Sequence, residues 1–204
     1  MLLPRTASLE DLLLRRNGLE FRRQNRYQVG SILASSLLHL YTTPWMARME
    51  KRNIVFPRNG LVLSIDRPYI LQSFKKLVPN TAATTQQAKA TQTTGADSEK
   101  AKEALESLGI LLLELCYGET IEQHPFRQKY LRRDGKVGRL TDLKTAREWA
   151  QDVGSQEPDL QDVILCCLNY SFPQKADWND VEFRQAVYDN IIKPIEDLAR
   201  AWTL

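Results

Sequence analysis

A run of thirteen residues in the middle of the chain, 105–117, constrains the fold more than any other part of the sequence. Leucine and isoleucine fill most of its positions, and they fall on nearly every side of a helix with 3.6 residues per turn. A helix that is apolar all round has to be buried on all sides. The run contains Glu114 and falls short of the roughly 18 apolar residues of a membrane span. The sequence therefore predicts a central helix over 104–117, ended by Gly118, and no membrane span.

Other segments show the spacing of helices with one buried face. Ser8 and Asp11 form a capping-box pattern, Pro158 suits a first helical turn, and Pro194 cannot donate a hydrogen bond to the carbonyl of Asn190 and should split its helix. Three helices are predicted over 9–16, over about 25–41, ended by Thr42–Pro44, and over 158–169. A fourth is capped by Thr141 and Asp142 and buries Leu143, Ala146, Trp149 and Val153. A fifth begins at Asp180 and buries Phe183, Val187 and Ile191, and a last helix ends at Trp202.

Two short segments have a different character. The β-branched runs 53–56 and 61–65 flank Pro57–Gly60, where Asn59 and Gly60 suit a tight turn, so we expect one small hairpin and no other. From Pro79 to Ala104 there is no large apolar residue. Such a tract buries too little surface to offset its ordering entropy, which predicts a disordered loop over 79–100. The fold expected is mainly α, a single domain over 1–204.

Charge is distributed unevenly along the chain. Residues 1–80 carry 13 Lys and Arg against 5 Asp and Glu, whereas residues 81–204 carry 15 against 20. A basic half suits nucleic acid, but the arginines occur as short pairs without a binding motif. We therefore interpret them as solvated helix faces or as a docking surface, and expect no nucleic-acid partner; binding through 5–58 with steep salt dependence is the alternative.

The residue types used most in catalysis and metal binding are scarce. Cys116, Cys166 and Cys167 lie in apolar helical runs, which predicts unpaired core cysteines in a reducing compartment, the cytoplasm or the nucleus, of which we expect the cytoplasm. His39 and His124 have no partner at ligand spacing, so no zinc site is expected. Ser35 and Ser36 lie near His39 on one predicted helix, for which a structural role is the simpler interpretation. The sequence offers no catalytic residue, no metal ligand and no cofactor site, and we expect no small-molecule ligand.

Several motifs, in order, resemble the C-terminal lobe of protein kinases. They are Ser8 to Leu13 (Ser-Leu-x-Asp-Leu-Leu), Leu37 to Tyr41, Asn53 to Phe56 at the end of the catalytic loop, Asp66 at the position of the metal-binding aspartate, and Ser107 to Leu115 (Ser-Leu-Gly-x-x-Leu-x-Glu-Leu). The resemblance implies a truncated kinase C-lobe with one small β-hairpin and a disordered loop.

The chain lacks the residues that a kinase uses for phosphate transfer. A kinase has its catalytic aspartate five residues before Asn53, where this chain has Arg48, and Glu50 replaces the following lysine. Arg67 and Pro68 follow Asp66 in place of Phe-Gly, and no glycine-rich phosphate loop is present. We therefore expect no enzyme. The alternative is a residual magnesium-nucleotide sensor that uses Asn53 and Asp66 as its ligands.

Longer motifs resemble an uncharacterised fungal family of degenerate kinase-like domains. They are Leu33 to Trp45, Ser107 to Gly118 and Ala146 to Trp149. The family is associated with heterokaryon-incompatibility and prion-type signalling regions. The resemblance implies a catalytically inactive, pseudokinase-like protein-interaction module in fungal self/non-self or cell-death signalling, with a protein partner. Trp45 is a candidate docking side chain, although a core position is the simpler interpretation, as it is for Trp149 and Trp202.

Overall fold

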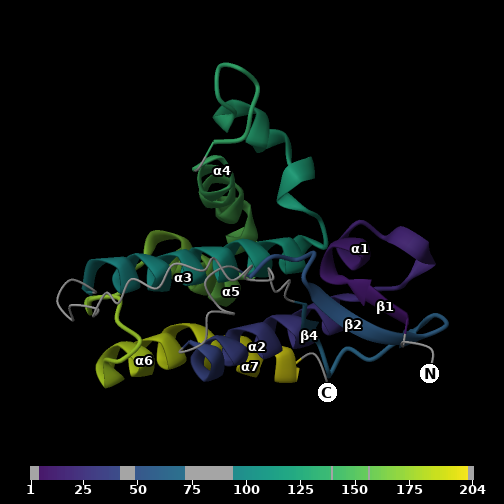
Figure 1. Ribbon diagram of the computed structural model, residues 1–204, viewed down its shortest axis with the longest axis horizontal. Helices are drawn as coiled ribbons and strands as arrows, with labels where there is room; N and C mark the ends of the chain where they lie inside the picture. The colour runs from purple at the N-terminus through teal and green to yellow at the C-terminus, as the bar shows by residue number, and fades with distance from the viewer. Residues whose placement is uncertain (1–4, 42–48, 72–93, 139, 156, 202–204) are drawn as a thin grey trace, which may run out of the picture.

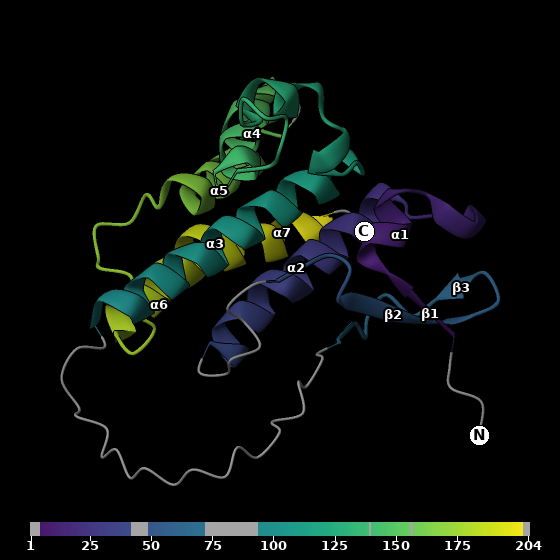
Figure 2. The ribbon, with the colours of Figure 1, turned by 45° about the horizontal axis from the view of Figure 1, so that its top comes forward.

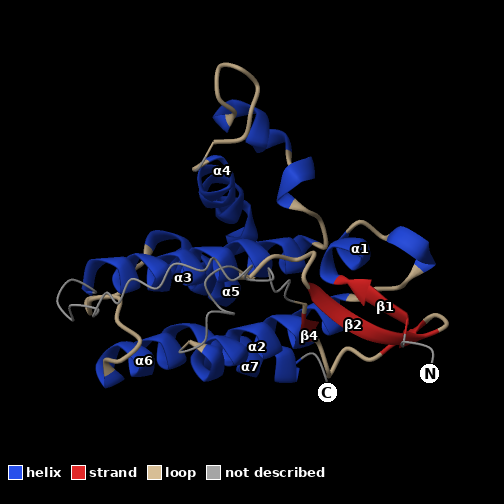
Figure 3. Ribbon diagram, in the orientation of Figure 1, coloured by secondary structure: helices blue, strands red, loops and turns tan. Residues whose placement is uncertain are grey.

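A computed structural model describes residues 5–41, 49–71, 94–138, 140–155 and 157–201. Within these ranges the protein is mainly α, with one small antiparallel sheet at one end (Figures 1 and 3). The helices are α1 (Leu9–Leu13), α2 (Arg23–Leu40), α3 (Thr94–Tyr117), α4 (Thr141–Trp149), α5 (Pro158–Asn169), α6 (Val181–Val187) and α7 (Lys193–Ala201). Short 3-10 helices are η1 (Arg16–Gly18), η3 (Ile121–Gln123), η4 (Pro125–Tyr130) and η5 (Ala150–Ser155).

Helix α3 is the central element, as its apolar sequence predicts. It packs against α5 and α4 on one side and against α2 on the other, and α7 packs on α2 (Figure 2). Its side chains at Leu105, Leu108 and Leu113 are completely buried. Gly118 ends it with a φ of +71°. A single cluster of buried apolar residues joins α3 to the surrounding helices and to the sheet.

The helix begins earlier than the sequence predicted. The loop expected over 79–100 lies outside the described residues as far as position 93, but α3 already includes 94–100, so that part of the prediction is wrong. Alanine, glutamate and lysine dominate 96–106 and favour helix without large apolar side chains. Asp97 and Lys100 form an ion pair one turn apart, and Ala101 is buried.

The sheet is larger than the single expected hairpin. The hairpin is present, with β2 (Ile54–Asn59) paired to β3 (Val62–Leu63). In addition, β1 (Arg5–Ser8) pairs antiparallel with β2, and β4 (Tyr69–Ile70) pairs with β2 at Ile54 and Val55. Arg58 pairs with both β1 and β3, and Val55 with both β1 and β4, so β3 and β4 share one edge of β2 and β1 occupies the other. Strands of two to four residues carry too little alternation to be recognised in sequence.

Most of the other helix predictions are confirmed. Ser8 and Asp11 form the capping box of α1, Pro158 begins α5, and Asp180 caps α6. The split at Pro194 takes the form of a π-helical turn, η6 (Tyr188–Ile192), between α6 and α7. The ends predicted at Thr42–Pro44 and at Trp202 lie outside the described residues. The capping role expected of Thr141 is wrong, because the N-cap of α4 is Leu140 and the Thr141 hydroxyl is bonded elsewhere.

Candidate functional site

A groove of about 740 Å³ is lined by residues of α3, of η3, of the segment 49–52 and of the chain around the start of α4, together with Glu10 of α1. Residues 49–52 form one wall, and Val137, Gly138, Leu140, Asp142 and Leu143 form a second. Helix α3 contributes residues between Glu99 and Glu114, and Ile121 and Glu122 of η3 also line the groove. Apolar side chains on its surface are Met49, Ile110, Leu111, Ile121, Val137, Leu140 and Leu143. The groove is therefore built from parts of the chain that are far apart in sequence.

Carboxylates dominate the groove. Among the described residues, the lining contains eight acidic side chains and two basic ones, Lys51 and Arg52. The acidic residues are Glu10, Glu50, Glu99, Glu103, Glu106, Glu114, Glu122 and Asp142. Arg52 is mostly exposed and is paired with Glu50 at 2.5 Å. A concave surface of one charge concentrates ligands of the opposite charge. The groove is thus suited to a cationic ligand.

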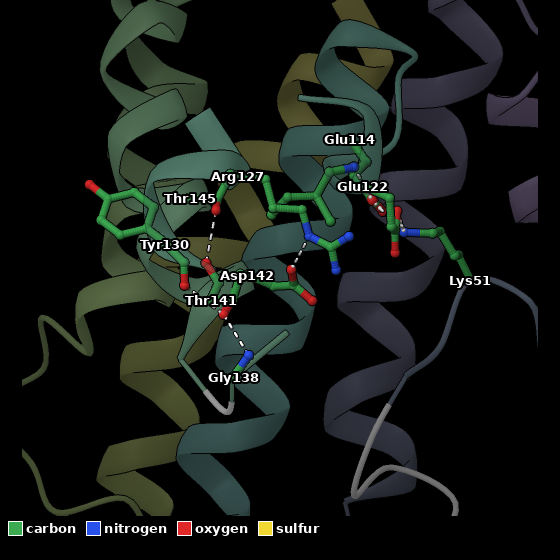
Figure 4. A network of polar contacts seen from close by, with 10 residues as sticks. Lys51, Glu114, Glu122, Arg127, Tyr130, Gly138, Thr141, Asp142 and Thr145 are labelled. Atoms are coloured by element: carbon green, nitrogen blue, oxygen red, sulfur yellow. Dashed lines mark hydrogen bonds and ion pairs between the residues drawn. The ribbon is translucent and has the colours of Figure 1, made fainter. Parts of the chain in front are cut away.

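One carboxylate lies almost completely buried at the end of the groove. Glu114, in the last turn of α3, has a side chain that is 1% exposed. Its Oε1 accepts hydrogen bonds from Lys51 Nζ at 2.6 Å and from the backbone N–H of Ile121 at 2.8 Å. Lys51 Nζ also donates to Glu122 Oε2 at 2.7 Å (Figure 4). The three side chains tie the 49–52 wall to α3 and η3.

Burial sets the ionisation of this cluster. Removal from water raises the pKa of Glu114, and the neighbouring Lys51 charge only partly opposes this. Burial alone would lower the pKa of Lys51, but the charge of Glu114 and the two hydrogen bonds outweigh it and raise that pKa. For half-buried Glu122, the contacts with Lys51 outweigh burial and lower the pKa. Among the described residues, Oε2 of Glu114 has no hydrogen-bond partner.

A second network holds in place the wall that contains Gly138 and Asp142 (Figure 4). The Thr141 hydroxyl accepts from the Gly138 N–H at 2.7 Å and donates to the Tyr130 carbonyl at 2.9 Å. Arg127 Nε donates to Asp142 Oδ1 at 2.8 Å. Both walls are therefore fixed by buried or partly buried polar contacts, so the groove is formed before any ligand arrives.

The residues proposed as a magnesium site are not in this groove. Asp66 follows β3; its side chain is 61% exposed and lies 3.4 Å from Arg67. Asn53 precedes β2, and its backbone N–H donates to the Glu50 carbonyl at 2.8 Å while its own carbonyl accepts from the Leu71 N–H at 2.7 Å. Among the described residues, no cluster of three or more His, Cys, Asp or Glu side chains could hold a metal ion.

The serine, cysteine, histidine and tryptophan residues named in the sequence analysis make packing or backbone contacts where the structure describes them. Ser35 Oγ donates to Glu196 Oε1 and Ser36 Oγ donates to the Ile32 carbonyl, while His39 Nδ1 lies 2.8 Å from the backbone carbonyl of Ser35, so neither serine hydroxyl is bonded to His39. The cysteines are unpaired; Cys167 is buried, whereas Cys116 and Cys166 are partly exposed. His124 stacks on Trp149, which is 2% exposed as predicted for a core side chain. Trp45 and Trp202 lie outside the described residues.

Sequence reasoning missed the groove. Its acidic base comes from Glu99, Glu103 and Glu106, which are spaced by four and three residues and so share one face of a helix. That spacing was a usable signal, but Glu99 fell within the segment predicted to be disordered. The pairing of Lys51 with Glu114 spans 63 positions and leaves no local pattern.

Fold and site together define a mainly α protein with a small antiparallel sheet and a preformed acidic groove. The chain belongs to the family described as Domain of unknown function (DUF7580), whose model matches residues 4–202. No curated protein and no solved structure matches it. Within the described part of the chain, no helix is both long and apolar enough to cross a membrane.

Proposed function

We propose that this protein is a non-catalytic interaction module whose acidic groove binds a protein segment that carries positive charge and apolar side chains. The observation that carries the proposal is the composition of the groove, whose described lining combines eight carboxylates and two basic residues with apolar side chains. Lysine or arginine side chains of a partner would meet the carboxylates, and apolar side chains would cover Ile110 and its neighbours.

The rigid walls of the groove favour binding over chemistry. Lys51 and the Thr141 hydroxyl each fix one wall through at least two hydrogen bonds. A preformed site avoids the entropy cost of ordering loops when the ligand arrives. A fixed groove with paired side chains on both walls is a docking surface, and its carboxylates give selectivity for a basic partner.

The proposed module is more specifically pseudokinase-like and acts in fungal self/non-self or cell-death signalling. This part of the proposal rests on the sequence resemblance. The replacement of the catalytic aspartate by Arg48 and of the lysine by Glu50 supports the absence of phosphotransfer. The position of Asp66, exposed and beside Arg67, adds support.

The test is selection of peptides from a displayed random library on the wild-type chain. We expect enrichment of sequences that combine Lys or Arg with Leu, Ile or Val. These peptides should lose at least tenfold in affinity for a groove variant, Glu103→Lys with Glu106→Lys, and should bind normally to a control with Glu182→Lys, at an exposed position of α6. Equal binding to wild type and groove variant, or enrichment of acidic peptides, would refute the proposal.

The nucleotide-sensor alternative is decided by thermal unfolding with and without ATP and magnesium. A ligand that binds only the folded state raises the midpoint. We expect no shift. A shift abolished by Asp66→Ala would instead favour the sensor.

A further inference from the structure

A basic cluster lies where the start of α2 meets the end of α3. Figures 1 and 2 show η1 and the first turns of α2 beside the C-terminal end of α3. The cluster consists of Arg15, Arg23 and Arg26, and the charges of the first two are near enough to act on that of Arg26. None of these arginines lines the acidic groove, so the cluster is a separate surface.

The carboxylates around the basic cluster are already paired. Among the described residues, three of them form ion pairs with arginines of this region; the pairs are Arg16 with Asp11, Arg22 with Glu20 and Arg23 with Glu157. The first turn of α2 contains no acidic residue. Within the described part of the chain, neither Arg15 nor Arg26 forms an ion pair.

Arg26 is the member of the cluster with the least favourable surroundings. Its side chain is partly buried, and its Nε is buried without a hydrogen-bond partner among the described residues. The guanidinium lies against Gly118 at the end of α3, where a Cβ would be 2.1 Å from Nη1 and 2.9 Å from Cζ. A buried donor without an acceptor destabilises the fold. The chain therefore holds a cation at this place at a cost in stability.

Neutral pH leaves positive charge in excess around Arg26. Burial lowers the pKa of Arg26, and the charges of Arg23 and Arg15 lower it further. Tyr27 and Cys116 oppose this only when they are ionised. Burial raises the pKa of Tyr27 to about 12 and raises that of the Cys116 thiol, so both are uncharged at pH 7. An arginine keeps its charge throughout this range.

We propose that Arg26, together with Arg15, binds the phosphate group of a small molecule. A guanidinium presents parallel N–H donors that match two oxygens of one phosphate. A phosphate monoester carries nearly two negative charges at pH 7, which matches the two arginines that have no ion pair. This site goes beyond the proposed function and does not depend on the acidic groove.

The experiment is thermal unfolding over a range of inorganic phosphate concentrations, with chloride keeping the ionic strength constant. The wild-type midpoint should rise with phosphate, because a ligand that binds the folded state stabilises it. For Arg26→Gln, the same rise should need about tenfold more phosphate or should be lost, since hydrogen bonds between charged groups are the strong ones. Arg15→Gln, at an exposed position, should weaken the response by a smaller factor.

Arg22→Gln is the matched control. It removes the same charge one turn before Arg26, from a side chain that is 76% exposed and already paired with Glu20, so the response to phosphate should stay as in wild type. Glycerol phosphate, with glycerol as its blank, distinguishes the two sources of the phosphate group. A stronger response to glycerol phosphate than to inorganic phosphate identifies a phosphate ester, and the reverse order identifies the free ion.

The same scans show whether Arg26 serves the fold or a ligand. Without phosphate, Arg26→Gln should unfold at a higher temperature than wild type, because it removes a partly buried charge that has no counter-ion. A lower midpoint with an unchanged response to phosphate would show that Arg26 is structural and would overturn the proposal. A wild type that does not respond to phosphate, or an equal loss of response in Arg22→Gln and Arg26→Gln, would also overturn it. If Arg26→Gln does not fold, Arg15→Gln decides, and an unchanged response there overturns the site.

Discussion

At the scale of single residues, Glu114 links the stability of the fold to the groove. Its carboxylate is removed from water, and its ionised form depends on Lys51, whose side chain is only 12% exposed. Loss of one partner from a buried ion pair leaves an uncompensated charge, which costs more than the pair itself contributes. The pair therefore fixes the wall of the groove only while both partners are present.

Replacement of Lys51 exposes this dependence. We expect Lys51→Met to destabilise the protein by about 3 kcal/mol at pH 8 and by less at pH 5, as measured by urea unfolding. Burial raises the pKa of Glu114 above its unfolded value, and loss of Lys51 raises it further. A carboxyl with a raised pKa stabilises the fold below its unfolded pKa, near 4.3, and loses that contribution as the pH rises through the folded pKa.

Two further variants separate this effect from general changes. The double variant Lys51→Met with Glu114→Gln should recover stability at pH 8 and lose the pH dependence, since the glutamine oxygen still accepts from the Ile121 N–H. Lys136→Met, at a side chain that is 78% exposed, should change stability by less than about 0.5 kcal/mol. If Lys51→Met lowered the free energy of unfolding equally at both pH values, the loss would not come from an unpaired Glu114 carboxylate.

Gly118 is a second residue whose identity is dictated by its surroundings. Its φ of +71° disfavours any side chain, and a Cβ there would lie 2.1 Å from an Arg26 guanidinium nitrogen. We expect Gly118→Ala to cost more than the roughly 1–2 kcal/mol of a left-handed alanine, measured by chemical unfolding. Gly135→Ala is the matched control, with φ +76° and nothing within 4 Å. Equal losses of stability in the two variants would show that the close contact with Arg26 adds no cost to an alanine at position 118.

At the scale of elements, the crossing of α3 and α5 depends on a glycine in the middle of α3. A Cβ at Gly109 would lie 2.8 Å from Cys167 Cβ, a core atom that cannot move aside. Helix propensity favours Gly109→Ala by about 1 kcal/mol, but the overlap forces the two helices apart, so we expect net destabilisation of about 1–3 kcal/mol. Gly95→Ala in the same helix meets nothing within 4 Å and should leave thermal stability unchanged or slightly higher. A stabilising Gly109→Ala would contradict this packing.

The long helices were predictable because their signals are local. The apolar run of α3, the capping box at Ser8 and the first-turn Pro158 each act within a few residues. Strands β1 and β4 were not, because each takes its stability from pairing with β2 more than ten residues away. The groove was least predictable, since its lining combines α3 with Lys51, which pairs with Glu114, and with Val137, Gly138 and the start of α4.

At the scale of the whole molecule, the distribution of buried residues predicts cooperative unfolding. One apolar cluster includes Ile54 and Phe56 of the sheet, Leu108 of α3 and Ile195 of α7, so no element has a separate core among the described residues. A small protein with one continuous core unfolds in a single all-or-none transition. Circular dichroism of the helices and tryptophan fluorescence should therefore report the same midpoint in thermal and in urea unfolding.

A substitution at the centre should move both signals together. Leu108 is completely buried, and we expect Leu108→Ala to cost about 2–5 kcal/mol and to lower both midpoints equally. Val181→Ala, at a side chain that is 66% exposed, should move neither by more than the equivalent of about 0.5 kcal/mol. If fluorescence and circular dichroism separated in Leu108→Ala or in wild type, the surroundings of Trp149 and Trp178 would unfold independently of the other helices.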